Sequence, residues 1–148
     1  MFFLKLAEGK KEIDFLYKAR THPSIDIMLS GTPPSNIEEH ENYIKKTQGI
    51  SRYIYVAYSE SVLVGYSQIY DIQKGQLEVG FVIYPDYQGQ GYGKRVVSET
   101  IKTAKTKFKD KKIVLYVKED NVIAQNIYKK AGFISKYIKD SLCCMELI

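Results

Sequence analysis

The chain has 148 residues, of which 45% are hydrophobic, so it is long enough to bury a substantial core. Its 22 Lys and Arg residues outnumber 17 Asp and Glu residues, giving a net charge of +5 that favours polyanionic ligands. No stacking or groove-reading motif accompanies this charge, and no apolar run approaches the roughly 20 residues of a membrane helix. The apolar start, Met1 to Leu4, is interrupted by Lys5 without a signal-peptide pattern. We therefore predict one domain spanning residues 1–148 that is cytoplasmic, with neither a nucleic acid nor a membrane as partner.

The first half of the chain predicts a strand at residues 2–6 and a helix around residues 12–19. Residues 24–34 show no regular pattern. A second helix is predicted to begin at Ser35, where Glu38 completes a capping box, and to end near Gly49.

The second half begins with strands at residues 52–58, 62–70 and 76–83, joined by short turns, one of them at Lys74-Gly75. These predict an antiparallel meander. A helix over residues 92–108 and a strand at residues 113–117 follow, so the last strand must lie parallel to residues 76–83 in a right-handed βαβ unit. A helix after Asn121 and a hairpin of residues 133–139 and 142–147 complete an α/β (α+β) fold.

The two cysteines, Cys143 and Cys144, are adjacent on the final predicted strand. This spacing suits neither a disulfide framework nor a common metal site. We expect reduced thiols and no metal.

A glycine-rich turn follows the strand of residues 76–83 and opens the next helix. Glycine lets a backbone approach a ligand closely, and the free N–H groups at a helix start attract anionic oxygens, so this turn predicts a pyrophosphate site. The P-loop pattern fails because Arg95 follows Lys94, and the dinucleotide fingerprint fails on its glycine spacing. What remains is Gln88-x-x-Gly91-x-Gly93.

A second motif reads Asn121-x-x-Ala124-x-x-x-Tyr128. On a helix these spacings place the three residues on one face, and Gly132 suits a left-handed helix end. One face could line one pocket, although a tyrosine on an amphipathic helix could equally be a core residue.

Together the two motifs resemble the GCN5-related N-acetyltransferase (GNAT) superfamily. The resemblance implies a mixed, mostly antiparallel sheet of six to seven strands with helices on both faces and splayed parallel strands at its centre. It also implies acetyl-CoA as the acetyl donor. The pyrophosphate would be wrapped by Gln88, Gly89, Gln90, Gly91, Tyr92, Gly93 and Lys94. The pantetheine arm would pair with Phe81, Val82 and Ile83 and contact Asn121, Ala124 and Tyr128. Lysines between residues 102 and 112 would lie near the adenosine 3′-phosphate, unless they form only a solvated face.

The resemblance implies acetyl transfer to an amine, which needs a base and an acid. Glu78 is the candidate base, acting directly or through water, although a glutamate on a strand could also be structural. Tyr128 is the candidate acid at the thioester sulfur. We expect direct transfer in a ternary complex.

The acceptor depends on the N-terminal half, where Arg20-Thr21-His22-Pro23 resembles a stretch of nucleotide amino-sugar N-acetyltransferases of flagellin and surface-glycan modification. Arg20 and His22 would then bind the acceptor, unless they are solvated residues at a helix end. A protein N-terminus, a small metabolite amine and a non-catalytic acyl-CoA sensor remain alternatives. A homodimer is common in the superfamily.

Overall fold

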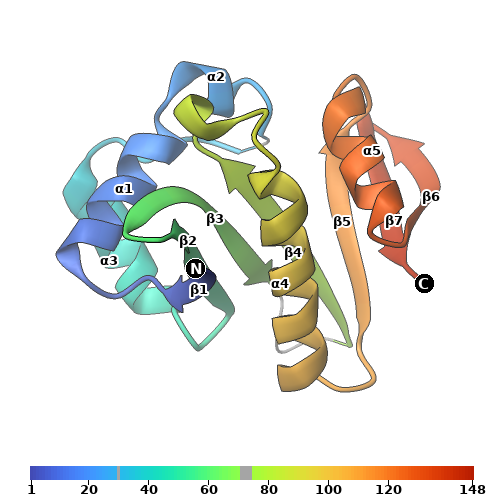
Figure 1. The fold of residues 1–148 in the computed structure, drawn as a ribbon, viewed down its shortest axis with the longest axis horizontal. Helices are drawn as coiled ribbons and strands as arrows, with labels where there is room; N and C mark the ends of the chain where they lie inside the picture. Colours follow the sequence, from blue (N-terminus) through green and yellow to red (C-terminus); the bar gives the residue numbers. More distant parts are fainter. Residues whose placement is uncertain (30, 71–74) are drawn as a thin grey trace.

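The computed structural model describes residues 1–29, 31–70 and 75–148. Within them, seven strands form one sheet in the order β1-β2-β3-β4-β5-β7-β6, and every neighbouring pair is antiparallel except β4 and β5 (Figure 1). The strands are β1 (Phe2–Leu6), β2 (Arg52–Ser59), β3 (Val62–Tyr70), β4 (Gln76–Ile83), β5 (Lys112–Lys118), β6 (Phe133–Lys139) and β7 (Leu142–Leu147). The helices are α1 (Lys10–Arg20), α2 (Pro23–Asp26), α3 (Ile37–Thr47), α4 (Tyr92–Lys107) and α5 (Val122–Lys130), with a 3-10 turn at Pro85–Tyr87.

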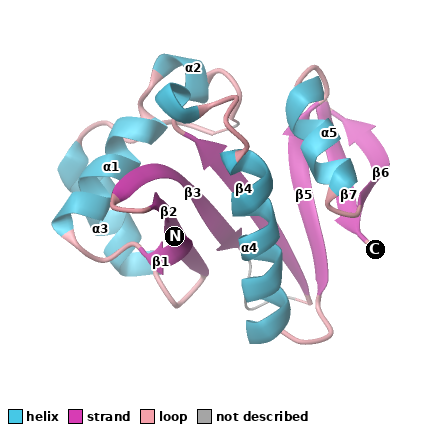
Figure 2. Cartoon of the chain, in the orientation of Figure 1, coloured by secondary structure: helices cyan, strands magenta, loops and turns pink. Residues whose placement is uncertain are grey.

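Helices cover both faces of the sheet, as Figure 2 shows. Side chains alternate between the faces along each strand, so β2 sends Ile54 and Val56 towards α1 and α3, and Tyr55 and Ala57 towards α4. Helices α4 and α5 lie together on this second face. The predicted α/β fold, with its mostly antiparallel sheet and central parallel pair, is confirmed.

The two parallel strands separate soon after they begin. β4 pairs with β5 only over Gln76–Glu78, opposite Lys112–Val114. Both strands then continue, and they diverge towards the end of the sheet where α4 starts (Figure 1). Residues 79–83 of β4 therefore have a strand partner on the β3 side alone among the described pairings.

The structure differs from the predicted elements in the N-terminal half. A short helix, α2, lies in the stretch predicted to be irregular, because His22 caps it and Pro23 occupies its first turn. Helix α3 is capped by Asn36 rather than Ser35, with the Asn36 side chain accepting a bond of 2.8 Å from the Glu39 N–H. Lys74 of the predicted turn lies outside the described residues, but the β3–β4 hairpin that it would join is confirmed.

The interior includes the two cysteines, which are buried free thiols on β7. None of the described helices is long and apolar enough to cross a membrane.

Candidate functional site

The glycine-rich turn connects the end of β4 to the start of α4. Gly89 and Gly91 adopt φ values of 77° and 87°, a left-handed conformation that favours glycine. Gly91 is the N-cap of α4 and no side chain caps this end, so the first N–H groups of a 16-residue helix are not bonded by a capping side chain. The Gln88 side chain donates a bond of 3.0 Å to the Ile83 carbonyl, which ties the turn to β4. This arrangement suits an anionic group such as a pyrophosphate.

Gly93, the last glycine of the motif, allows α4 to pack closely against its neighbours. A Cβ added to Gly93 would lie 3.4 Å from Ile127 Cδ1 on α5 and 3.8 Å from Ile83 Cγ1 on β4. Its absence lets the start of α4 lie close to both elements, so the uncapped helix end stays beside the opening between β4 and β5.

The edge of β4 beside that opening carries backbone groups for a ligand. The Tyr84 N–H donates to the Val64 carbonyl on β3 at 2.9 Å. Because backbone groups alternate in direction along a strand, those of Val82 point to β3, and those of Phe81 and Ile83 point to the side that β5 has left, where the Ile83 carbonyl also accepts from Gln88. An extended amide chain could complete this edge as an added strand would.

Helix α5 lies across the same opening. Asn121 is its N-cap, and its side-chain oxygen accepts a bond of 3.3 Å from the Ala124 N–H, so it orders the helix start. Two turns on, the Tyr128 ring lies 5.5 Å from Phe81 on β4 and 6.2 Å from Phe133 on β6. Burial raises the pKa of Tyr128 to about 12, so its hydroxyl stays protonated near neutrality and can donate a hydrogen bond.

Glu78 stands where the two parallel strands begin to separate. It forms the last β4–β5 pair with Val114 and is also paired with Tyr70 on β3. Its neighbours Leu77 and Val79 are buried under α4, so strand alternation places Glu78 on the α1/α3 face. The pKa of Tyr70 is raised first by burial, then by Tyr66, with a further contribution from the negative charge of Glu78. The carboxylate and this phenol are therefore close neighbours.

The α1/α3 face also holds a pocket of about 480 Å³, which we call the α3 pocket. Arg52 is its central cation. The guanidinium lies 4.8 Å from the Tyr43 ring centroid and 4.5 Å from that of Tyr70, and its Nη1 donates to Gln68 Oε1 at 2.7 Å. The lining residues are Leu16, Arg20, Gly31, Thr32, Pro34, Glu39, His40, Tyr43, Arg52, Ile54, Tyr66, Gln68 and Tyr70.

Sequence reasoning missed this pocket. Residues 52, 54 and 66, 68, 70 alternate onto one face of two neighbouring strands. An arginine and a glutamine on an inward strand face were the signal that could have revealed it.

The structure separates the two predicted acceptor residues. Arg20 lines the α3 pocket, but its Nη1 forms an ion pair of 2.8 Å with Asp26, and its Nη2 donates to the Gly31 carbonyl at 3.3 Å. His22 caps α2, where its Nδ1 accepts from the Ser24 N–H at 3.2 Å, and its ring lies 5.5 Å from that of Tyr84. Both residues have local structural partners, and His22 is not among those lining the pocket.

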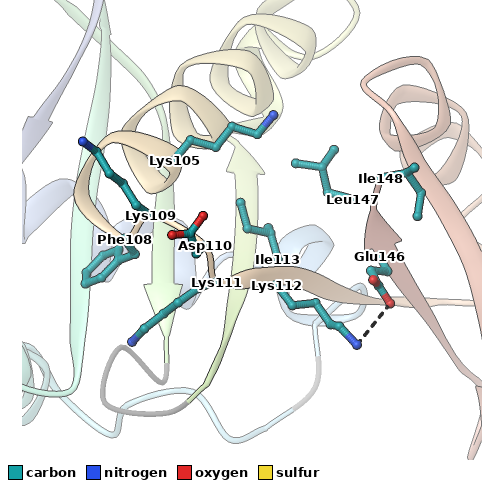
Figure 3. A pocket seen from close by; sticks show the side chains of 10 residues that line it. All are labelled: Lys105, Phe108, Lys109, Asp110, Lys111, Lys112, Ile113, Glu146, Leu147 and Ile148. Atoms are coloured by element: carbon teal, nitrogen blue, oxygen red, sulfur yellow. Dashed lines mark ion pairs between the residues drawn. The ribbon is translucent and has the colours of Figure 1, made fainter.

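A second pocket, of about 450 Å³, lies at the other end of α4. Its lysines point in different directions, and Lys112 forms an ion pair of 3.8 Å with Glu146 (Figure 3). Sixteen residues of α4, about 24 Å, separate this end from the glycine-rich turn. That lysines between residues 102 and 112 lie near the adenosine 3′-phosphate, rather than forming only a solvated face, stays a prediction. No group of three or more His, Cys, Asp or Glu residues in the described ranges could hold a metal ion.

Comparisons with known proteins agree with this geometry. The model of the acetyltransferase (GNAT) family matches residues 18–133. No curated protein matches the chain. The chain is similar in structure to a spermidine N-acetyltransferase from Vibrio cholerae in complex with CoA and spermine, with 18% identity and a TM-score of 0.86 over 99% of this chain and 94% of that one. It is also similar to the N-acetyltransferase PseH of Campylobacter jejuni in complex with acetyl-CoA, with 23% identity and a TM-score of 0.78 over 99% and 98% of the two chains. Since the family model covers most of its length, the chain belongs to the acetyltransferase (GNAT) family, a family of acetyl-CoA-dependent N-acetyltransferases.

Proposed function

We propose that this protein transfers the acetyl group of acetyl-CoA directly to a primary amine, and that the acceptor enters from the α3 pocket. The main observation behind the proposal is that β5 separates from β4 directly after Glu78 and Val114. It leaves an unpaired strand edge between the anion-binding turn on one side and a polar pocket on the other. Donor and acceptor can thus approach one point from opposite faces of the sheet.

The donor site consists of the β4 edge at Phe81 to Ile83, the turn from Gln88 to Lys94, and the α5 residues Asn121, Ala124 and Tyr128. Acetyl-CoA, when bound, supplies an acyl group on a sulfur leaving group. A β4 N–H, with Phe81 the best placed, holds the carbonyl oxygen and stabilises the negative charge that develops there. The Tyr128 hydroxyl donates to the sulfur.

Glu78 accepts the proton that the acceptor ammonium must lose, either directly or through water. The neutral amine then attacks, a C–N bond forms, the C–S bond breaks, and the departing sulfur is stabilised by the Tyr128 hydroxyl. No residue of the chain carries the acyl group between donor and acceptor.

For the acceptor we propose an amine that also carries a negative charge, with a nucleotide-linked amino sugar as the first candidate. The lining of the α3 pocket contains two guanidinium groups, from Arg20 and Arg52, and one carboxylate, from Glu39. Arg20 is already paired with Asp26, so Arg52 is the guanidinium offered to a ligand. Burial, aided by the charge of Arg20, lowers the pKa of His40, so this histidine is neutral at pH 7. Such a pocket disfavours a polycation, although one structural neighbour is a spermidine acetyltransferase.

Replacing Glu78 by Gln tests the catalytic assignment. We expect turnover to fall by about 10²–10⁴-fold while the Kd for CoA, measured by calorimetry, changes little. Glu8→Gln, which neutralises an exposed carboxylate near the N-terminus, is the matched control and should keep full turnover. Equal turnover in wild type and Glu78→Gln would show that Glu78 is not the base.

A further inference from the structure

We propose that Arg52 is the residue that selects the acceptor, by binding an anionic group at a fixed distance from the reacting amine. The proposal rests on the proposed function, because it identifies the α3 pocket as the acceptor site. It concerns a residue that contacts the acceptor far from the bond that forms.

Arg52 is held in one orientation before any ligand arrives. The rings of Tyr43 on α3 and Tyr70 on β3 lie within 5 Å of its guanidinium carbon, and Gln68 accepts from one terminal nitrogen. Contacts of a guanidinium with aromatic rings are favourable, and they fix a side chain that would otherwise lose rotamer freedom on binding a ligand. A planar, oriented guanidinium is well suited to a carboxylate or phosphate.

The immediate surroundings of Arg52 supply hydrogen-bonding groups that the described protein does not satisfy. Its Nε and the Nδ1 of His40 are buried and have no hydrogen-bond partner among the described residues. A buried, unsatisfied polar atom usually costs about 1–3 kcal/mol, so such atoms in one pocket indicate a site built for a polar ligand.

The sheet register sets the distance to the reaction centre. Arg52 pairs with Tyr70, and Tyr70 pairs with Glu78, so the three residues form one row across β2, β3 and β4. Neighbouring strands lie about 4.8 Å apart, which places the backbones of Arg52 and Glu78 roughly 10 Å from each other. An acceptor with its amine at Glu78 and its anion at Arg52 is therefore elongated.

Tyr70 links the two ends of this row. Its ring covers Gly80 of β4 so closely that a Cβ on Gly80 would lie 3.3 Å from the ring, while Arg52 stacks on the same tyrosine. The glycine therefore lets the ring extend from the arginine to the strand that carries Glu78. An acceptor lying along this ring would reach from Arg52 to the β4 edge.

Three amines of similar length test whether the protein selects an anionic acceptor. At the end opposite the amine, aminohexanoate carries an anion, hexylamine a methyl group and diaminohexane a cation. We expect wild type to use aminohexanoate with a kcat/KM about 10–100-fold above that for hexylamine, and diaminohexane least well. In Arg52→Gln this preference should disappear, chiefly through a raised KM, whereas Arg52→Lys should keep part of it. Lys136→Gln removes one exposed charge from β6, at the far edge of the sheet, and should leave the preference unchanged.

Equal use of the three amines by wild type, or a preference for diaminohexane, would overturn the proposal. If Arg52→Gln does not fold, the second measurement is competition by hexanoate against aminohexanoate in wild type. An absence of competition would also overturn the proposal. If no amine releases CoA thiol, the proposed function fails separately. Calorimetric titration of the CoA-loaded protein with inorganic pyrophosphate then decides on Arg52. Weaker binding by Arg52→Lys than by wild type supports the site, and equal binding contradicts it.

Discussion

Replacing Tyr128 by Phe removes one hydroxyl and keeps the ring between Phe81 and Phe133. Burial raises the pKa of this phenol to about 12, whereas an ordinary alkyl thiol has a pKa of about 8.5. Complete proton transfer from the phenol to a thiolate is therefore uphill by about 3.5 pKa units, or roughly 5 kcal/mol. Tyr128 should act by donating a hydrogen bond to the departing sulfur rather than by giving up its proton.

The magnitude follows from that distinction. A hydrogen bond to a charged group contributes about 1.5–3 kcal/mol, which corresponds to a loss of roughly 10–150-fold in kcat for Tyr128→Phe. Release of CoA thiol at saturating acetyl-CoA and amine measures kcat, and calorimetry with CoA should show a nearly unchanged Kd. A loss above about 10³-fold with intact cofactor binding would refute this reasoning and indicate full proton transfer. An unchanged kcat would remove Tyr128 from the reaction altogether.

Two further predictions concern the turn and the fold. Gly91→Ala forces a side chain into a backbone with φ of 87°, at a cost of about 1–2 kcal/mol that the free turn relieves by leaving the conformation that binds CoA, so the Kd for CoA should rise by roughly tenfold. Gly75→Ala, where a Cβ meets nothing within 4 Å, should have no such effect. Equal affinities of wild type and Gly91→Ala for CoA would contradict the role of the turn. Burial raises the pKa of the Glu12 carboxyl, but hydrogen bonds from Tyr58, Lys5 and Gly9 together lower it by more. The pKa of Glu12 therefore lies below its ordinary value of 4.5. The ionised Glu12 carboxylate therefore stabilises the folded state above pH 4.5, and this contribution is lost as the pH falls through the folded-state pKa. Glu12→Gln should reduce the free energy of unfolding by about 1.5–3 kcal/mol at neutral pH and by less at lower pH. A difference between wild type and Glu12→Gln in urea unfolding that does not vary with pH would contradict this.

The fold around the proposed donor site could be predicted because its sequence signals are local. A strand, a glycine turn and a helix follow one another within residues 76–107, and the crossover rule then fixes β5 parallel to β4. The separation of these strands was expected from the family resemblance alone, and the pairing ending at Glu78 and Val114 confirms it.

The α3 pocket, the proposed acceptor site, could not be predicted in the same way. Tyr43, Arg52 and Tyr70 are distant in sequence and meet only when α3 packs on the β2–β3 hairpin. Motif spacing contains no information on such a contact.

Acceptor-dependent acetyl transfer is the most direct test of the account. Wild-type protein is incubated with acetyl-CoA and aminohexanoate, and the CoA thiol released and the N-acetyl product formed are both quantified, with a parallel sample lacking the amine. We predict one acetylated amine for each thiol released, negligible release without the amine, and strong loss of both signals in Glu78→Gln but not in Glu8→Gln. Thiol release that is independent of any amine, or no acetylated product from any amine despite tight CoA binding, would contradict direct transfer at the opening between β4 and β5.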